Sequence, residues 1–210
     1  MILVDMNQVT ISNLMIQMKN EPLSVDLVRH LVLNSIRSYR TKFFNEFGEL
    51  ILCYDDKHYW RRDLFPYYKS NRKKDRTESN LNWNELFETL NLIRDELKET
   101  FPYKVLQVDG AEADDIIATI VNLVSKTPNL FEKILIMSGD KDFIQLQTHE
   151  NVQQYSPTLK KFINGVDPNT YKIEHIFKGD RGDGIPNILS PDNTFVEGLR
   201  QKPLGKNKID

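Results

Sequence analysis

The chain has 210 residues, a mass of 24.6 kDa and a formal net charge of −2, with 40% hydrophobic and 28% charged residues. This balance is typical of a folded globular protein and excludes disordered and collagen-like classes. The lone Cys53 excludes an internal disulfide or a cysteine-based zinc site, and the start of the chain lacks the features of a signal peptide. Since no apolar run approaches the ~18 residues of a membrane span, we expect a cytoplasmic protein without membrane contact.

Four short apolar runs predict the buried strands of a mainly parallel sheet. They are residues 1–4, 49–54, 104–108 and 133–137. Segments with helical periodicity separate these runs, beginning at Ser24, at Asn82 and at residue 111. Strands that alternate with helices predict an α/β fold.

The last third of the chain predicts less regular structure. Residues 151–155 and 160–163 have the pattern of an edge hairpin, and Asp167-Pro168 favours a helix start because proline is preferred at the first helical position. Glycine and proline recur beyond Lys178, where little regular structure is expected. We therefore place a domain boundary there, with one domain over 1–178 and a second region over 179–210.

Acidic residues follow each predicted strand at the point where it ends. They are Asp5, Asp55, Glu112 with Asp114, and Asp140 with Asp142. Functional sites of open α/β sheets form beyond the carboxyl ends of the strands, so these side chains are expected to converge. Crowded carboxylates repel one another unless cations neutralise them, and such oxygen ligands suit Mg²⁺ or Mn²⁺. Two such ions can activate water and stabilise the leaving oxygen of a phosphodiester.

The spacing of these acids limits how they can converge. Within a regular helix Glu112 and Asp114 would diverge, so they can meet only if Glu112 precedes the helix, whereas Asp115 would neighbour Glu112. Asp140 and Asp142 would point the same way in extended chain. Other strand-end acids, namely Asp56, Asp109 and Asp180, fit ordinary turn or cap positions.

A basic segment over residues 57–76 carries eight basic residues and only two acidic ones. By itself such a run is more often a solvated helix face than a nucleic-acid site. Aromatic residues alternate with its charges, however, and aromatic rings can stack on unpaired bases. They are Tyr59, Trp60, Phe65, Tyr67 and Tyr68.

Four motifs, in this order, resemble the 5′-nuclease (flap endonuclease) superfamily. They are the segment from Tyr59 to Arg72, Glu112-Ala-Asp-Asp115, Ser138-Gly-Asp-Lys-Asp-Phe143 and Gly179-Asp-Arg-Gly-Asp-Gly-Ile-Pro186. The resemblance runs from Asp5 to about Arg200. It implies a PIN-like α/β nuclease domain with a helical arch at about 57–80. It also implies that 179–210 begins a helix–hairpin–helix-like duplex-binding region, truncated relative to the family.

The resemblance implies a role for each matching residue. The metal ligands would be Asp5, Asp55, Glu112, Asp114 and Asp140 in a first cluster, and Asp142 and Asp183 in a second. The catalytic basic residues would be Lys69 and Arg72, with Arg61 at the base of the arch. Nucleic acid would be bound by Arg61, Arg62, Tyr68, Lys69, Arg72, Lys73 and Lys74, and by Gly179, Gly182 and Gly184 through their backbone.

The implied enzyme is a two-metal phosphodiesterase, with 5′-to-3′ exonuclease, flap endonuclease and ribonuclease H activity. Its substrates would be DNA and the RNA of RNA–DNA hybrids with a 5′ end or flap, as in primer removal during phage replication in the host cytoplasm. The implied cofactors are two Mg²⁺ ions, which Mn²⁺ can replace, and K⁺ at the glycine-rich loop. We expect a monomer, with a replication single-strand-binding protein or clamp as a candidate partner. Two alternatives stay open: a PIN-type ribonuclease, and a non-catalytic accessory protein that binds DNA junctions.

Overall fold

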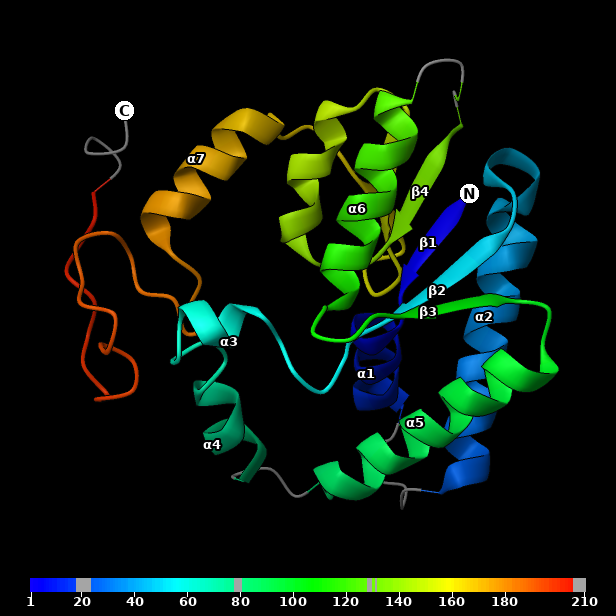
Figure 1. Cartoon of the computed structure of the whole chain (residues 1–210), viewed down its shortest axis with the longest axis horizontal. Coiled ribbons are helices and arrows are strands. Elements are labelled where there is room, and N and C mark those ends of the chain that lie inside the picture. The colour runs from blue at the N-terminus through cyan, green and yellow to red at the C-terminus, as the bar shows by residue number, and fades with distance from the viewer. Residues whose placement is uncertain (18–23, 78–80, 128–129, 131, 206–210) are drawn as a thin grey trace. The chain divides into compact units, whose positions relative to one another are not determined.

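The computed structural model describes residues 1–17, 24–77, 81–127, 130 and 132–205, without the side chains of 73–75 (Figure 1). Two compact units make up the chain. The first comprises Met1–His58 and Asn84–Gly165, and the second comprises Tyr59–Trp83 and Val166–Asp210. No helix in the described part is long and apolar enough to cross a membrane.

A six-stranded sheet forms the centre of the first unit, in the order β3-β2-β1-β4-β5-β6. Its strands are β1 (Ile2–Asp5), β2 (Leu50–Tyr54), β3 (Lys104–Gln107), β4 (Ile134–Met137), β5 (Val152–Ser156) and β6 (Lys161–Ile163). All neighbours are parallel except β5 and β6, which form the predicted antiparallel edge hairpin. The four predicted parallel strands and the α/β class are thereby confirmed.

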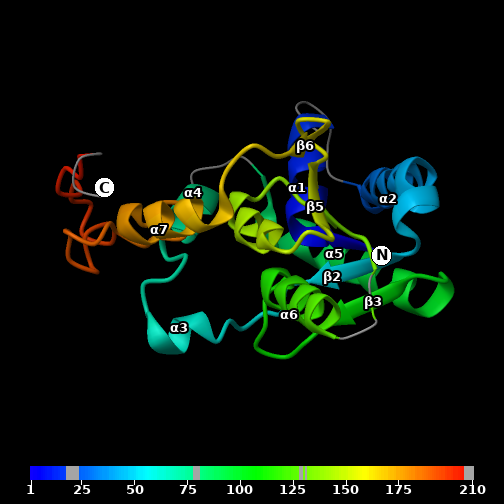
Figure 2. The same cartoon turned by 90° about the horizontal axis from the view of Figure 1, so that it is seen from above.

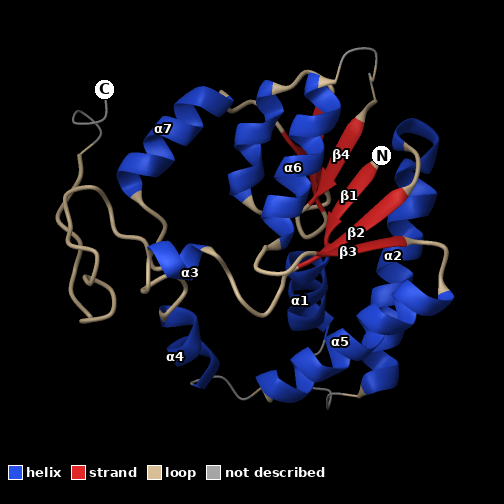
Figure 3. Cartoon of the chain, viewed as in Figure 1, coloured by secondary structure: helices blue, strands red, loops and turns tan. Residues whose placement is uncertain are grey.

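Helices cover both faces of this sheet (Figures 2 and 3). They are α1 (Met6–Gln17), α2 (Val25–Phe47), α5 (Trp83–Thr100), α6 (Ala113–Lys126) and the 3₁₀ helix η1 (Lys141–Thr148). Alternate residues of a strand point to opposite faces, and Leu3 and Ile136 pack in one buried cluster with Ile117 of α6. Helices α1 and α2 pack against the other face of β1. This double cover explains why the central strands are continuously apolar.

Two helix starts follow the capping chemistry that the sequence predicts. Ser24 caps α2, and its Oγ accepts a hydrogen bond from the Leu27 amide at 3.1 Å. Asp167 caps α7 (Pro168–Lys178), and its carboxylate accepts a hydrogen bond from the Thr170 amide at 2.7 Å. Each cap satisfies an amide that no preceding turn can satisfy.

In the second unit the described residues form the helices α3 (Arg61–Leu64), α4 (Asn71–Thr77) and α7. Beyond α7 the described chain forms turns and one isolated bridge between Asp180 and Ile185. The expectation of little regular structure after Lys178 is therefore confirmed. The predicted domain division at residue 178 stays a prediction. In the structure, residues 59–76 of the basic segment belong to the same compact unit as the glycine-rich loop.

Candidate functional site

Asp5 lies where the topology of the sheet changes direction. The chain builds β2 and β3 on one side of β1 and then β4 on the other, so the ends of β1 and β4 flank the switch point. The Asp5 carboxylate accepts hydrogen bonds from the Gln8 amide at 3.1 Å and from the Ser138 hydroxyl at 3.0 Å. Only 4% of Asp5 is exposed. The end of β4 therefore fixes the carboxylate that ends β1.

Asp55 joins the end of β2 to two helices. Its Oδ1 accepts a hydrogen bond from the Ala113 amide at 2.8 Å, and its Oδ2 accepts one from Nδ2 of Asn7 at 2.7 Å. Ala113 is the first residue of α6, so the carboxylate also satisfies a helix N-terminus, where negative charge is favoured. Sequence reasoning missed Asn7, which follows Asp5 by two residues at the start of α1.

Glu112 precedes α6 and has extended backbone angles, with φ −90° and ψ 163°. This meets the condition under which Glu112 and Asp114 can converge. Glu112 is 1% exposed, and Asp114 is half-buried in the first turn. The Asp115 carboxylate accepts a hydrogen bond from the Glu112 amide at 3.0 Å, so it caps the helix. Asp115 thus has a structural role beside the predicted ligands.

Asp140 and Asp142 follow β4 and are both half-buried. The Asp140 carboxylate accepts a hydrogen bond from the Asp142 amide at 3.0 Å, and the Asp140 amide donates to the Ser138 hydroxyl at 3.1 Å. The side-chain amide of Gln154 donates to the carbonyl oxygens of Ser138 and Asp140 from the buried strand β5. Sequence reasoning missed Gln154, because β5 contains two adjacent glutamines and a serine, and its sequence does not show which of them is buried.

The carboxyl group of Asp5 is affected electrostatically by Asp55 and Asp140. Burial, followed by the negative charge of Asp55, raises the pKa of Asp5 to about 7, and Asp140 adds to the rise. In the described chain these three acids are held by hydrogen bonds rather than by ion pairs with lysine or arginine. A cluster of this kind is stabilised by protons or by a bound cation.

Without metal, the stability of the chain should fall as the pH rises from about 4 to about 7. Native Asp5 holds its proton up to a pKa of about 7, whereas the unfolded residue releases it near pH ~4, so the native state binds more protons in this window. Each pH unit should cost at most ~1.4 kcal/mol of unfolding free energy. Urea unfolding in EDTA at pH 5 and pH 7.5 measures the change.

Asp5→Asn is the matched comparison for this titration. It removes the carboxyl and keeps an acceptor for Gln8, so the variant should lose this part of the pH dependence. The pKa of Asp56 is shifted in the opposite direction, because the hydrogen bond from the Gly110 amide lowers it. This shift is present in both proteins and therefore cancels in the comparison. An unchanged pH profile in Asp5→Asn would show that Asp5 is not the titrating group.

The predicted arch residues lie in the second unit, around α3, the turn after it and α4. The guanidinium groups of Arg61 and Arg62 lie 4.7 Å and 5.0 Å from the ring centroids of Trp60 and Tyr59. Tyr68 is only 4% exposed, so its predicted stacking role would require the ring to become accessible. The side chains of Lys73 and Lys74 lie outside the described residues.

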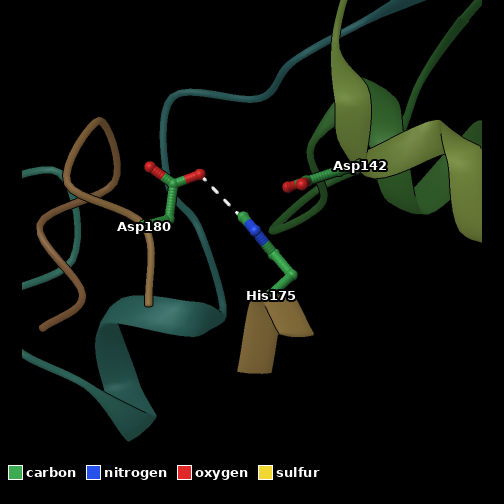
Figure 4. A group of neighbouring side chains, drawn as sticks. All are labelled: Asp142, His175 and Asp180. Carbon is green, nitrogen blue, oxygen red and sulfur yellow. Dashed lines mark ion pairs between the residues drawn. The ribbon is translucent and has the colours of Figure 1, made fainter. Parts of the chain in front are cut away.

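The glycine-rich loop also belongs to the second unit. Gly179 and Gly184 have positive φ angles of 66° and 75°, and Gly182 lies between them. The Asp180 carboxylate accepts a hydrogen bond from the Asp183 amide at 3.1 Å, and its Oδ2 lies 3.6 Å from Nε2 of His175 (Figure 4). Asp180 therefore shapes the loop, as its predicted turn role requires, and its pairing with His175 was missed.

Asp183, a predicted metal ligand, forms ion pairs with two predicted catalytic residues in the second unit. Its carboxylate oxygens lie 2.7 Å from a terminal guanidinium nitrogen of Arg72 and 3.8 Å from Nζ of Lys69. Sequence reasoning assigned Lys69 and Arg72 to phosphate contact and Asp183 to metal binding, and it did not predict that Asp183 contacts the other two.

A family model and the similar proteins of known name both point to 5′-nucleases. The model of the 5′-3′ exonuclease N-terminal resolvase-like domain matches residues 13–176. Ribonuclease H of Enterobacteria phage T4 is 38% identical over 219 residues, which cover 99% of this chain and 70% of that protein. A 5′-3′ exonuclease of Buchnera aphidicola is 30% identical over 164 residues, covering 75% of this chain but only 53% of the relative.

The fold also matches a solved structure. The flap endonuclease D15 of bacteriophage T5, solved with DNA and metal ions, superposes with a TM-score of 0.69 at 20% identity, covering 99% of this chain and 81% of that one. At this identity the match supports the fold alone. The family-model match and the similarity to the phage T4 ribonuclease H confirm the resemblance seen in the motifs.

Proposed function

The chain belongs to the family of the 5′-3′ exonuclease N-terminal resolvase-like domain, and we propose that it is a metal-dependent nuclease acting from 5′ ends and at 5′ flaps. The observation that carries this proposal is the set of carboxylates at the switch point of the sheet. Asp5 ends β1 and Asp55 follows the neighbouring strand β2, and burial, followed by the negative charges of Asp55 and Asp140, raises the pKa of Asp5. Such a set suits a phosphodiesterase that uses divalent cations.

The donor set fits Mg²⁺. It consists of carboxylate oxygens, the ligands that hard divalent cations prefer, and a cation would offset both the burial of the Asp5 charge and its repulsion by Asp55 and Asp140. Asp5, Asp55 and Asp140 would hold the first ion, together with Glu112 and Asp114. Bound metal supplies an activated water and stabilises the leaving oxygen. Hydrogen bonds from Asn7, Gln8 and Ser138 would hold these ligands in place.

For the substrate we propose DNA and RNA–DNA hybrids with a 5′ end or flap, as in primer removal during phage replication. The basic segment around α3 and α4 supports this choice, because its aromatic and cationic side chains suit unpaired nucleotides. Lys69 and Arg72 would contact the phosphates near the reaction, while Gly179, Gly182 and Gly184 would face duplex phosphates with their backbone.

The finer cofactor and partner assignments are also proposals. Mn²⁺ should replace Mg²⁺ because both take oxygen ligands. We also propose a K⁺ ion at the glycine-rich loop, where the carbonyl oxygens of Ile185 and Pro186 lie close to Gly179. We further propose a monomer that cooperates with a replication single-strand-binding protein or clamp, and Asp142 and Asp183 as ligands of a second Mg²⁺.

The decisive experiment compares cleavage of a 5′-labelled flap DNA with cleavage of a single-stranded RNA, each with Mg²⁺ and with EDTA. The proposal expects Mg²⁺-dependent cleavage of the flap and a much slower reaction on the RNA. Preference for the RNA would favour a PIN-type ribonuclease instead. Binding of the flap without cleavage in Mg²⁺ or Mn²⁺ would favour a non-catalytic junction-binding protein.

A further inference from the structure

Two basic side chains of the arch share one acidic partner within the second unit. Asp183 lies 2.7 Å from the Arg72 guanidinium and 3.8 Å from the Lys69 ammonium, with 18% of its side chain exposed. Lys69 is itself only 9% exposed. Lysine is rarely so buried without a compensating charge, since removing an ammonium from water is costly. Asp183 therefore does more here than an ordinary surface ion pair.

The backbone holds these groups in register. The Lys69 amide donates to the Asp183 carbonyl oxygen at 2.8 Å, and Nδ2 of Asn71 donates to the Arg181 carbonyl oxygen at 2.7 Å. Lys69 has a positive φ of 54°, a conformation that costs a non-glycine residue energy unless its surroundings impose it. The turn before α4 is thus fixed against the glycine-rich loop, and the side chains meet as a consequence.

Aromatic rings complete the environment of the Lys69 ammonium. Its Nζ lies 4.8 Å from the ring centroid of Tyr68 and 5.5 Å from that of Tyr59. Both distances are within the range of cation–π attraction. The ammonium is therefore held at a defined position, and a second anion that reaches this position would meet an ordered cation.

We propose that Asp183 is the resident counter-ion of Lys69 and Arg72 and that a nucleic-acid phosphate displaces it on binding. The inference rests on the proposed function, because it takes this basic pair as a phosphate contact. A phosphate offers the same anionic oxygens as the carboxylate, and arginine binds both in the same forked geometry. Asp183 thus keeps the basic pair ordered before substrate binds and weakens binding of any strand that cannot replace both contacts.

The first test measures the ion pair without nucleic acid. Thermal unfolding is compared for the full chain, Asp183→Asn, Arg72→Ala and the double variant. Each single change should lower the midpoint, and the double change should lower it by clearly less than the two effects together, because both remove one interaction. Strictly additive effects would mean that Asp183 and Arg72 are not coupled, and would overturn the proposal whatever the nuclease assay shows.

The second test measures competition with a phosphate backbone. A labelled single-stranded DNA oligonucleotide is titrated in EDTA at fixed salt, so that metal binding plays no part. Asp183→Asn should bind about three- to tenfold more tightly than the unmodified chain, the range of a partly buried ion pair of about 1 kcal/mol. In a Lys69→Ala, Arg72→Ala background, the same change should alter affinity by less than about twofold.

A matched control separates this effect from the loss of one negative charge. Asp63 is an exposed acid of α3 in the same unit. Asp63→Asn should change affinity less than about twofold in both backgrounds, because long-range repulsion between exposed charges is screened. An equal gain from Asp183→Asn in both backgrounds, or no gain in either, would overturn the displacement. Absence of DNA binding by every variant would instead refute the proposed function, and the unfolding cycle would still report the ion pair.

Discussion

Asp140→Asn is expected to lower Mg²⁺-dependent cleavage of a 5′-flap substrate by at least about 100-fold. Substitution of residues that only hydrogen-bond to metal ligands costs up to about 100-fold, and loss of a ligand should cost no less. Asparagine keeps the oxygen that accepts the Asp142 amide, so η1 should keep its cap. The substitution removes one negative charge from the cluster of Asp5, Asp55 and Asp140. Metal affinity should therefore fall while the local fold survives.

Two further measurements make this expectation specific. Binding of DNA in EDTA should be unchanged or tighter, since a negative charge has been removed. Asp109→Asn, which changes an exposed carboxylate after β3, should leave cleavage within about twofold of the unmodified rate. A near-normal rate for Asp140→Asn at low Mg²⁺ would exclude Asp140 as a ligand, and an equal loss in Asp109→Asn would point to a general charge effect.

The strands and the convergence of Asp55 and Asp140 on Asp5 could be predicted because both depend on local pattern. That these acids bind metal stays a prediction. Apolar runs that end in an acid indicate buried parallel strands, and the carboxyl ends of such strands share one edge of the sheet. The sequence spacing showed that Glu112 and Asp114 can converge only if Glu112 precedes the helix, but it did not show whether this is so. In the structure Glu112 has extended backbone angles before α6. Helix α1 was not predicted, because it follows β1 directly and mixes polar with apolar residues in its first turns.

The residues that form hydrogen bonds to the carboxylates and to the loop after β4 could not be predicted from the sequence, for a different reason. Ser138 and Gln154 act through hydrogen bonds across the sheet, and only the packing of strands decides which side chains meet. The contact between Lys69 and Asp183 joins residues 114 positions apart, and no periodicity encodes such a pair. The same is true of the burial of Tyr68, to which the family resemblance assigned a role in nucleic-acid binding.

Gly179→Ala should be among the most destabilising single changes in the second unit. Gly179 ends α7 with a φ of 66°, where a side chain is strained by about 1 kcal/mol. An added Cβ would lie only 2.4 Å from the carbonyl oxygens of Ile185 and Pro186. These are backbone atoms, so relief requires the loop to move and its bridge between Asp180 and Ile185 to break. We expect a total loss of at least about 3 kcal/mol.

Gly198→Ala gives the matched control for this change. Gly198 has a similar φ of 69° in the same unit, but an added Cβ would meet no atom within 4 Å. Its loss should be about 1 kcal/mol, from backbone strain alone. Urea unfolding gives both values, and binding of a DNA duplex in EDTA should weaken in Gly179→Ala alone, because the loop that would face the phosphates is displaced. Equal losses of unfolding free energy in the two variants would show that the loop relaxes around the new methyl group. The close approach of the backbone at Gly179 would then not determine the shape of the glycine-rich loop.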